Sequence, residues 1–213
     1  MDKQSNILRK ETSEYISSIA EKMKELNRAL ESKNIIVEDE NKYIRIVIDS
    51  TQNILSIDIS DILINSTNKK EVIGYIMKNI NMAIERSLKH NMEELLNINS
   101  PGNYREIISR EQPSVREGII ELEREIGLLP QILNAMTKSK ISESGNVTIN
   151  MSGANVLLSM EIAEEYLSKK NKEKVAEEIM ETVNRIVREN KQEVRDRIEK
   201  SDTKITKIIH GEY

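Results

Sequence analysis

The sequence predicts an α+β protein made of two tandem copies of one α-β-β-β-α unit. The main observation is an internal repeat at an offset of 103 residues, which continues without a gap when Tyr43 is aligned with Asn146. Polar markers such as Ser56 and Ser159 also coincide. A repeat at a fixed offset indicates that each copy forms the same supersecondary unit. The coinciding apolar pairs are Ile44 with Val147, Ile46 with Ile149, Ile48 with Met151, Leu55 with Leu158, Ile57 with Met160 and Ile59 with Ile162.

The first unit begins with an amphipathic helix, predicted over residues 7–32 from apolar positions at three- and four-residue steps. Three segments of high β propensity follow and predict an antiparallel meander. Asn68 with Glu71 three residues later resembles a capping box, which predicts the start of a long helix. The predicted strands are Ile35–Val37, Tyr43–Asp49 and Ile54–Ile59. The apolar stripe of the long helix is Val72, Ile76, Ile80, Ile84, Leu88 and Leu95.

The boundary between the copies contains residues that break regular structure, including Pro101, Gly102 and Pro113. We therefore predict a first unit over residues 1–97, a linker over 98–113, a second unit over 114–200 and a weakly ordered tail over 201–213. In the first helix of the second unit, Gly127 and Pro130 predict a kink or a break near Leu128 and Leu129. The longest helix is predicted from Lys172 to about Lys200, with the apolar stripe Val175, Ile179, Val183, Ile186, Val187, Val194 and Ile198.

Composition narrows the classes of function. The chain has no Cys, so a disulfide framework, a thiolate nucleophile and a thiol metal site are excluded. It has no Trp or Phe, which disfavours stacking of nucleic-acid bases. A net charge of -4 argues against a globally basic protein but permits local basic stripes. No apolar run approaches the length of a membrane span, so we expect a cytoplasmic protein with no membrane partner.

The sequence contains no motif for catalysis or for cofactor binding. Its seven glycines are scattered, and none forms a nucleotide-binding loop. His90 and His210 are too few and too far apart for a metal cluster or a catalytic relay, and we expect His90 to be a helix-surface residue. Asp49, Asp58 and Asp61 could form acid–base pairs, but strand geometry predicts that such charges face solvent. We therefore expect neither an enzyme nor a cofactor or a metal.

The remaining functional signal is the placement of charge on the long helices. On the last helix, acidic residues dominate before Asn184 and basic residues recur at three- or four-residue steps after it. This basic stripe consists of Arg185, Arg188, Lys191 and Arg195. Such a stripe can contact phosphates, although pairing with Glu189, Glu193 and Glu199 would instead give a solvated helix face. A milder counterpart on the first helix consists of Lys22, Lys24 and Arg28.

Each unit resembles the YbaB/EbfC family of small bacterial nucleoid-associated proteins, with a helix, a meander and a long charged helix in that order. The resemblance is best in the second copy, where Asn146–Ile162 is similar to the strand, glycine turn and strand of the family. The helix from Val175 onward is similar to the family's helix, and Asn184, with Asn81 by the repeat, stands where the family has an Asn. The resemblance covers roughly residues 13–95 and 116–198.

The resemblance implies an intramolecular pseudo-dimer, because members of the family are single units that form homodimers and bind DNA. We therefore expect a monomer of the cytoplasmic nucleoid that binds duplex DNA weakly through the basic stripes. The alternative is a protein-interaction module, similar to an adaptor or a secretion chaperone, that binds a protein partner and no DNA.

Overall fold

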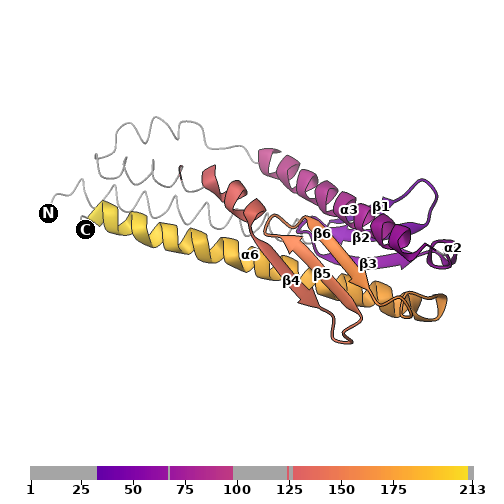
Figure 1. Cartoon of the computed structure of the whole chain (residues 1–213). Coiled ribbons are helices and arrows are strands. Elements are labelled where there is room, and N and C mark those ends of the chain that lie inside the picture. The colour runs from indigo at the N-terminus through magenta and orange to yellow at the C-terminus, as the bar shows by residue number, and fades with distance from the viewer. Residues whose placement is uncertain (1–32, 67, 98–123, 125–126, 211–213) are drawn as a thin grey trace.

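The computed structural model describes residues 33–66, 68–97, 124 and 127–210, and the helix predicted over 7–32 and the linker over 98–113 lie outside these residues. Each copy contains a three-stranded antiparallel sheet followed by a long helix (Figure 1). The first copy comprises β1 (Asn34–Glu38), β2 (Ile44–Asp49), β3 (Ile54–Ile59), α2 (Asp61–Ile64) and α3 (Lys69–Asn97). The second comprises a helix at residues 127–135, then β4 (Thr137–Ile141), β5 (Val147–Ser152), β6 (Leu157–Ile162), η1 (Lys169–Asn171) and α6 (Lys172–His210).

The predicted strands are confirmed, and the two meanders share fine details of register. In both, the pairing of the second strand with the third contains a register shift at the same place. It lies between Val47 and Ile48 in the first copy and between Asn150 and Met151 in the second. The turns match too, because Lys42 and Gly145 occupy equivalent positions and both have a positive φ, 55° and 78°. The backbone of the turn is therefore the same although only the second copy has glycine there.

The side chain of Asn68 caps α3 as predicted, since its Oδ1 atom accepts a hydrogen bond of 3.3 Å from the backbone N–H of Glu71. The apolar stripes of α3 and α6 lie in one core shared by both copies. Its fully buried helix residues include Ile76, Ile80, Ile179 and Val183. The stripe ends earlier than predicted on both helices, because Leu88 and Ile198 are 47% and 50% exposed.

Two further predictions differ from the structure. The segment predicted as a weakly ordered tail is helical up to His210, because α6 continues past Lys200. Residues 127–135 form an uninterrupted helix through Leu128 and Leu129, so the predicted break does not occur at these residues.

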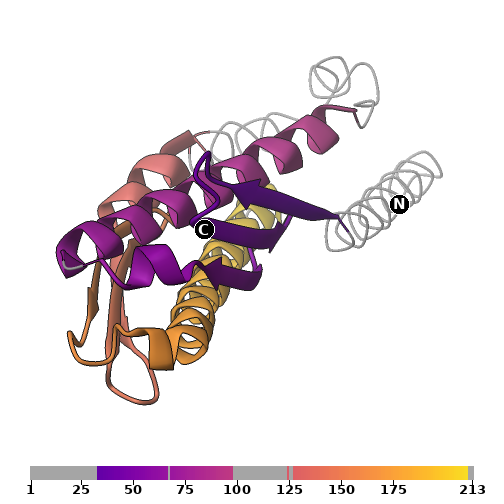
Figure 2. The ribbon, with the colours of Figure 1, turned by 90° about the vertical axis from the view of Figure 1, so that its right-hand side faces the viewer.

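Each long helix packs against both sheets, so the copies interlock (Figure 2). The contact that fixes this arrangement is a reciprocal pair of asparagines. On α6, Asn184 accepts a hydrogen bond from the backbone N–H of Ile54 and donates one to its carbonyl, both 2.8 Å. On α3, Asn81 does the same for Leu157 of the other copy, at 2.8 and 3.0 Å. Asn81 and Asn184 are 103 residues apart, and so are Ile54 and Leu157. The two contacts are therefore equivalent, and the copies are related by a pseudo-twofold axis.

The asparagine contacts provide hydrogen-bond partners for the edge strands of the two sheets. Strands β3 and β6 end their sheets, so one side of each presents backbone N–H and C=O groups with no strand partner. A carboxamide carries a donor and an acceptor side by side, and it can pair with both groups of a single residue as a neighbouring strand would. The edge of each sheet is therefore completed by the helix of the other copy.

A cluster of charges joins the copies at the start of α2. The carboxylate of Asp61 lies 2.7 Å from the ammonium groups of both Lys169 and Lys172 in the second copy. Hydrogen bonds from Lys169 and then Lys172 lower the pKa of Asp61 from 3.8 to about 2. At the equivalent position Lys69 instead donates to the carbonyl of Ile64 within its own copy, at 2.9 Å.

We predict that Asn81→Ala and Asn184→Ala each lower the free energy of unfolding by roughly 1–3 kcal/mol, because each leaves an N–H and a C=O of the facing strand without a partner. Urea denaturation followed by circular dichroism measures this loss. As a control, Lys78→Ala changes an exposed position of α3 and should stay within about 0.5 kcal/mol of the parent. Equal stability of Asn184→Ala and Lys78→Ala would contradict the role given to Asn184.

The Asp61 cluster predicts a specific pH dependence. The folded state lowers the pKa of Asp61, so it favours the carboxylate, and the resulting stability is present above pH 3.8 and lost as the pH falls through about 2. Asp61→Asn should therefore lower the melting temperature at neutral pH, and the difference from the parent should close between pH 3.8 and 2. Added salt should shrink the difference, because the pairs are exposed. A difference independent of pH would exclude ion pairing as its cause.

Candidate nucleic-acid interface

Three of the four residues in the predicted stripe on α6 lie along one groove. Arg188, Lys191 and Arg195 form one wall of a groove of about 610 Å³, and the turn between β2 and β3 forms another wall. Steps of three and four residues place these side chains on the same face of the helix. Asn184 lies on this face four residues before Arg188, and its bonds to Ile54 hold α6 against β3. The contact that joins the two copies therefore also positions the cationic residues over the turn.

Arg185 is directed away from this groove. Its Nη2 donates to the backbone carbonyl of Ile141 at the end of β4, and the side chain is half-buried. It lines an adjoining cavity of about 340 Å³ with Glu181 and Ser142, and Arg188 lines both this cavity and the groove. Arg185 is therefore near Arg188 but does not line the groove with Lys191 and Arg195. Lys22, Lys24 and Arg28 lie outside the described residues.

The acidic neighbours of the stripe form ion pairs elsewhere. Glu189 lies 2.8 Å from Lys140 on β4, and Glu193 lies 3.0 Å from Arg197 on α6. Arg188 and Arg195 are exposed and form no ion pair within the part of the chain that the structure describes. Pairing with Glu189 and Glu193 therefore does not neutralise these two guanidinium groups.

The other wall of the groove consists of residues that the sequence analysis did not identify. The turn contributes Asn53 and Leu55, and α3 contributes Leu88 and Asn91. Leu55 and Leu88 are each 47% exposed, so the groove combines cations, amides and apolar surface. These residues come from the other copy and from another helix, and no local spacing in the sequence indicates that they meet the stripe.

The residues considered for acid–base or metal chemistry have structural partners instead. Asp49 is buried, against our expectation that it faces solvent, because its carboxylate accepts hydrogen bonds from Thr51 and Asn53 and so closes the β2–β3 turn. The Nδ1 atom of His90 lies 3.2 Å from the hydroxyl of Ser50 at the same turn. Among the described residues, no three or more His, Cys, Asp or Glu side chains form a group that could hold a metal. None of the described helices is apolar over the length needed to cross a membrane.

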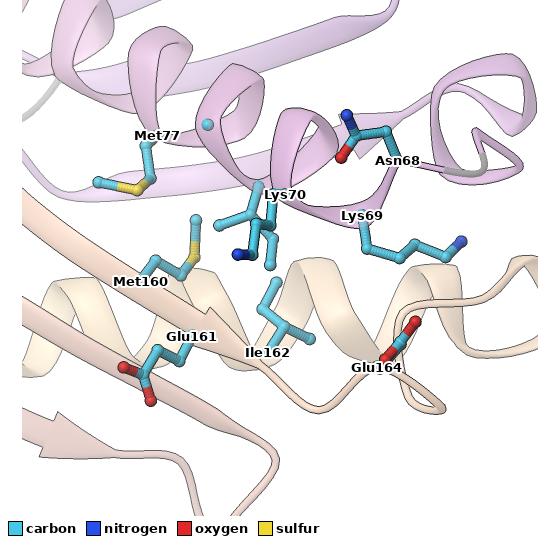
Figure 3. A pocket seen from close by; sticks show the side chains of 10 residues that line it. Asn68, Lys69, Lys70, Met77, Met160, Glu161, Ile162 and Glu164 are labelled. Carbon is cyan, nitrogen blue, oxygen red and sulfur yellow. The ribbon is translucent and has the colours of Figure 1, made fainter.

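A second cavity, of about 650 Å³, lies between α3 and β6 (Figure 3). Met77, Met160 and Ile162 line it together with Gly74, and charged residues of both signs stand around them. Gly74 adds no side chain to this lining, whereas Glu177 occupies the equivalent position on α6. The two seams between helix and sheet have therefore diverged since the duplication.

The fold defines a duplicated α+β protein whose two copies form one body around a shared core. Comparison with protein-family models finds the YbaB/EbfC DNA-binding family twice, over residues 10–101 and 119–204. These two matches cover most of the chain, which belongs to this family as a tandem duplication. No curated protein and no solved structure matches the chain.

Gly74, in the cavity between α3 and β6, gives a test of the space along this helix–sheet seam. A methyl group at Gly74 would meet no atom within 4 Å, so Gly74→Ala should raise the free energy of unfolding by about 1 kcal/mol through helix propensity alone. The contrasting variant is Gly153→Ala, whose methyl group would lie 2.7 Å from the carbonyl of Leu133 and should destabilise the protein. Urea denaturation of both variants checks the predictions. Destabilisation by Gly74→Ala would show that the seam is closed in solution.

Proposed function

We propose that this chain is a non-enzymatic, nucleoid-associated-type protein that binds duplex DNA weakly through the groove beside α6. Membership of a DNA-binding family supports the choice of ligand. The observation that carries the proposal is the grouping of Arg188, Lys191 and Arg195 along one groove, with the guanidinium groups of Arg188 and Arg195 unpaired among the described residues. Arg185, Lys22, Lys24 and Arg28 are proposed as additional contacts. Such binding would place the protein in the nucleoid, and we expect it to act as a monomer.

The dimensions of the stripe suit a DNA backbone. Arg188 and Arg195 are seven residues apart, which corresponds to about 10.5 Å along a helix. One strand of B-DNA presents a phosphate about every 3.4 Å along its axis, so this length spans about three phosphates for three cationic side chains. Contacts of this kind position a protein on DNA without reading its sequence. The net charge of -4 opposes the approach of DNA, and the binding should therefore be weak and sensitive to salt.

Fluorescence anisotropy with a labelled duplex, titrated at several salt concentrations, tests the proposal. The triple variant Arg188→Gln, Lys191→Gln, Arg195→Gln should bind more weakly than the parent. The slope of log affinity against log salt should flatten by about 2.7, because each phosphate contact contributes about 0.9. The fold should persist, since none of the three side chains belongs to the buried core.

A matched control removes the same charge from elsewhere on the surface. Lys78, Lys170 and Lys174 are exposed and lie outside the groove, so their joint replacement by Gln should leave the salt slope unchanged. The proposal fails if both triple variants lose affinity equally, or if the parent does not bind duplex DNA even at low salt.

The protein-interaction module remains the second candidate, and the cavity between α3 and β6 favours it. Methionine side chains such as Met77 and Met160 adapt to different partners, and Gly74 lets a partner backbone approach closely. Two results together would favour this function over DNA binding. The parent would not bind duplex DNA even at low salt, and a specific protein would bind the parent but not the variant Gly74→Met, whose side chain fills the cavity.

A further inference from the structure

We infer that the chain contacts DNA through one half of a pseudo-symmetric surface, so that its site on DNA is an asymmetric half-site. This inference rests on the proposed function and adds the shape of the contact to it. It follows from three observations: where the pseudo-twofold axis lies, where the groove lies, and which residues the two copies place on either side.

The axis passes close to the groove. The Nδ2 of Asn155 donates a hydrogen bond of 2.6 Å to the Oε1 of Gln52, and these residues are separated by 103 positions, which is the repeat itself. Two equivalent residues can touch each other only near the axis that relates them. Gln52 also lines the groove, together with Leu88 of α3 and Lys191 of α6, which are another equivalent pair. The groove therefore reaches the axis, and equal copies would continue it on the other side.

The residues on the other side have changed in character. Each of the three cations that line the groove is replaced on α3 by an acidic or apolar residue: Glu85 for Arg188, Leu88 for Lys191 and Met92 for Arg195. The turn has changed in the same direction, because Val156 stands in place of Asn53. Glu85 is exposed, and Leu88 and Val156 are 47% and 45% exposed, so these replacements lie on the surface and are not core residues.

At these equivalent positions only the α6 side carries cations. Arg86 and Lys89 of α3 are exposed, but they correspond to Glu189 and Gln192 of α6 and not to the groove residues. The carboxylate of Glu85 repels a phosphate where Arg188 would attract it, and Leu88 offers no charge or hydrogen bond. A protein with twofold symmetry presents the same contacts to two half-sites, which favours sites with matching symmetry in DNA. Here the contacts run over about 10.5 Å of α6 on one side of the axis only, so the site on DNA has no symmetry to match.

Restoring the missing charges tests the inference. The double variant Glu85→Arg, Leu88→Lys copies the α6 residues onto their equivalents on α3, at two exposed positions where the fold should tolerate them. In anisotropy titrations with a labelled duplex longer than both halves, the variant should bind more tightly than the parent. Its salt slope should become steeper by about 1.8, or two further phosphate contacts. Short duplexes that only cover one half should show a smaller gain.

A control separates position from net charge. Glu177→Arg, Ile36→Lys makes the same change of charge at exposed positions outside the groove. The inference is supported if the α3 double variant steepens the slope and this control does not. It is overturned if the α3 variant binds as the parent does, or if both variants gain equally. Should the double variant melt at a lower temperature, Glu85→Arg alone, which does not line the groove, must still steepen the slope by about 0.9.

The same titrations distinguish the two levels of the proposal. A parent that does not bind at low salt contradicts the proposed function itself, and the half-site inference with it. A parent that binds through Arg188, Lys191 and Arg195 while the α3 variant changes nothing contradicts only the half-site inference.

Discussion

The structure depends on one carboxamide in each copy that pairs with the edge strand of the other. Asn81 pairs with the N–H and C=O of Leu157, and Asn184 pairs with those of Ile54. The edge of each sheet is therefore completed by the long helix of the other copy. Buried backbone groups need partners, and these are supplied only when both copies are in place. The shared core, the position of α6 over the β2–β3 turn and the groove beside it all follow from this exchange.

The duplication kept the backbone while the surface diverged. Gln52 and Asn155 both adopt a positive φ, 67° and 63°, at equivalent turns, and the irregularity in the strand register also recurs. Apolar helix positions such as Ile76 and Ile179 stay buried in both copies. Exposed positions had no such constraint, so the cations of the groove on α6 have no counterparts at the equivalent positions of α3.

Sequence periodicity was sufficient for the strands, the long helices and the burial of residues such as Ile80 and Val183, because these features depend on local pattern. It failed where tertiary contacts decide the outcome. Asp49 is buried because a turn surrounds its carboxylate, and Arg185 departs from the stripe because a carbonyl of β4 lies within its reach. The wall formed by Leu55 and Asn91 could not be predicted, since it joins segments that no local spacing relates.

Fusion of the two copies changes how the fold responds to dilution. Two separate units associate according to their concentration, whereas units joined in one chain meet at an effective concentration that does not depend on how dilute the protein is. The edge strands that Asn81 and Asn184 complete therefore stay covered at any protein level. A cell could keep very few molecules of this protein without exposing those strands to aggregation.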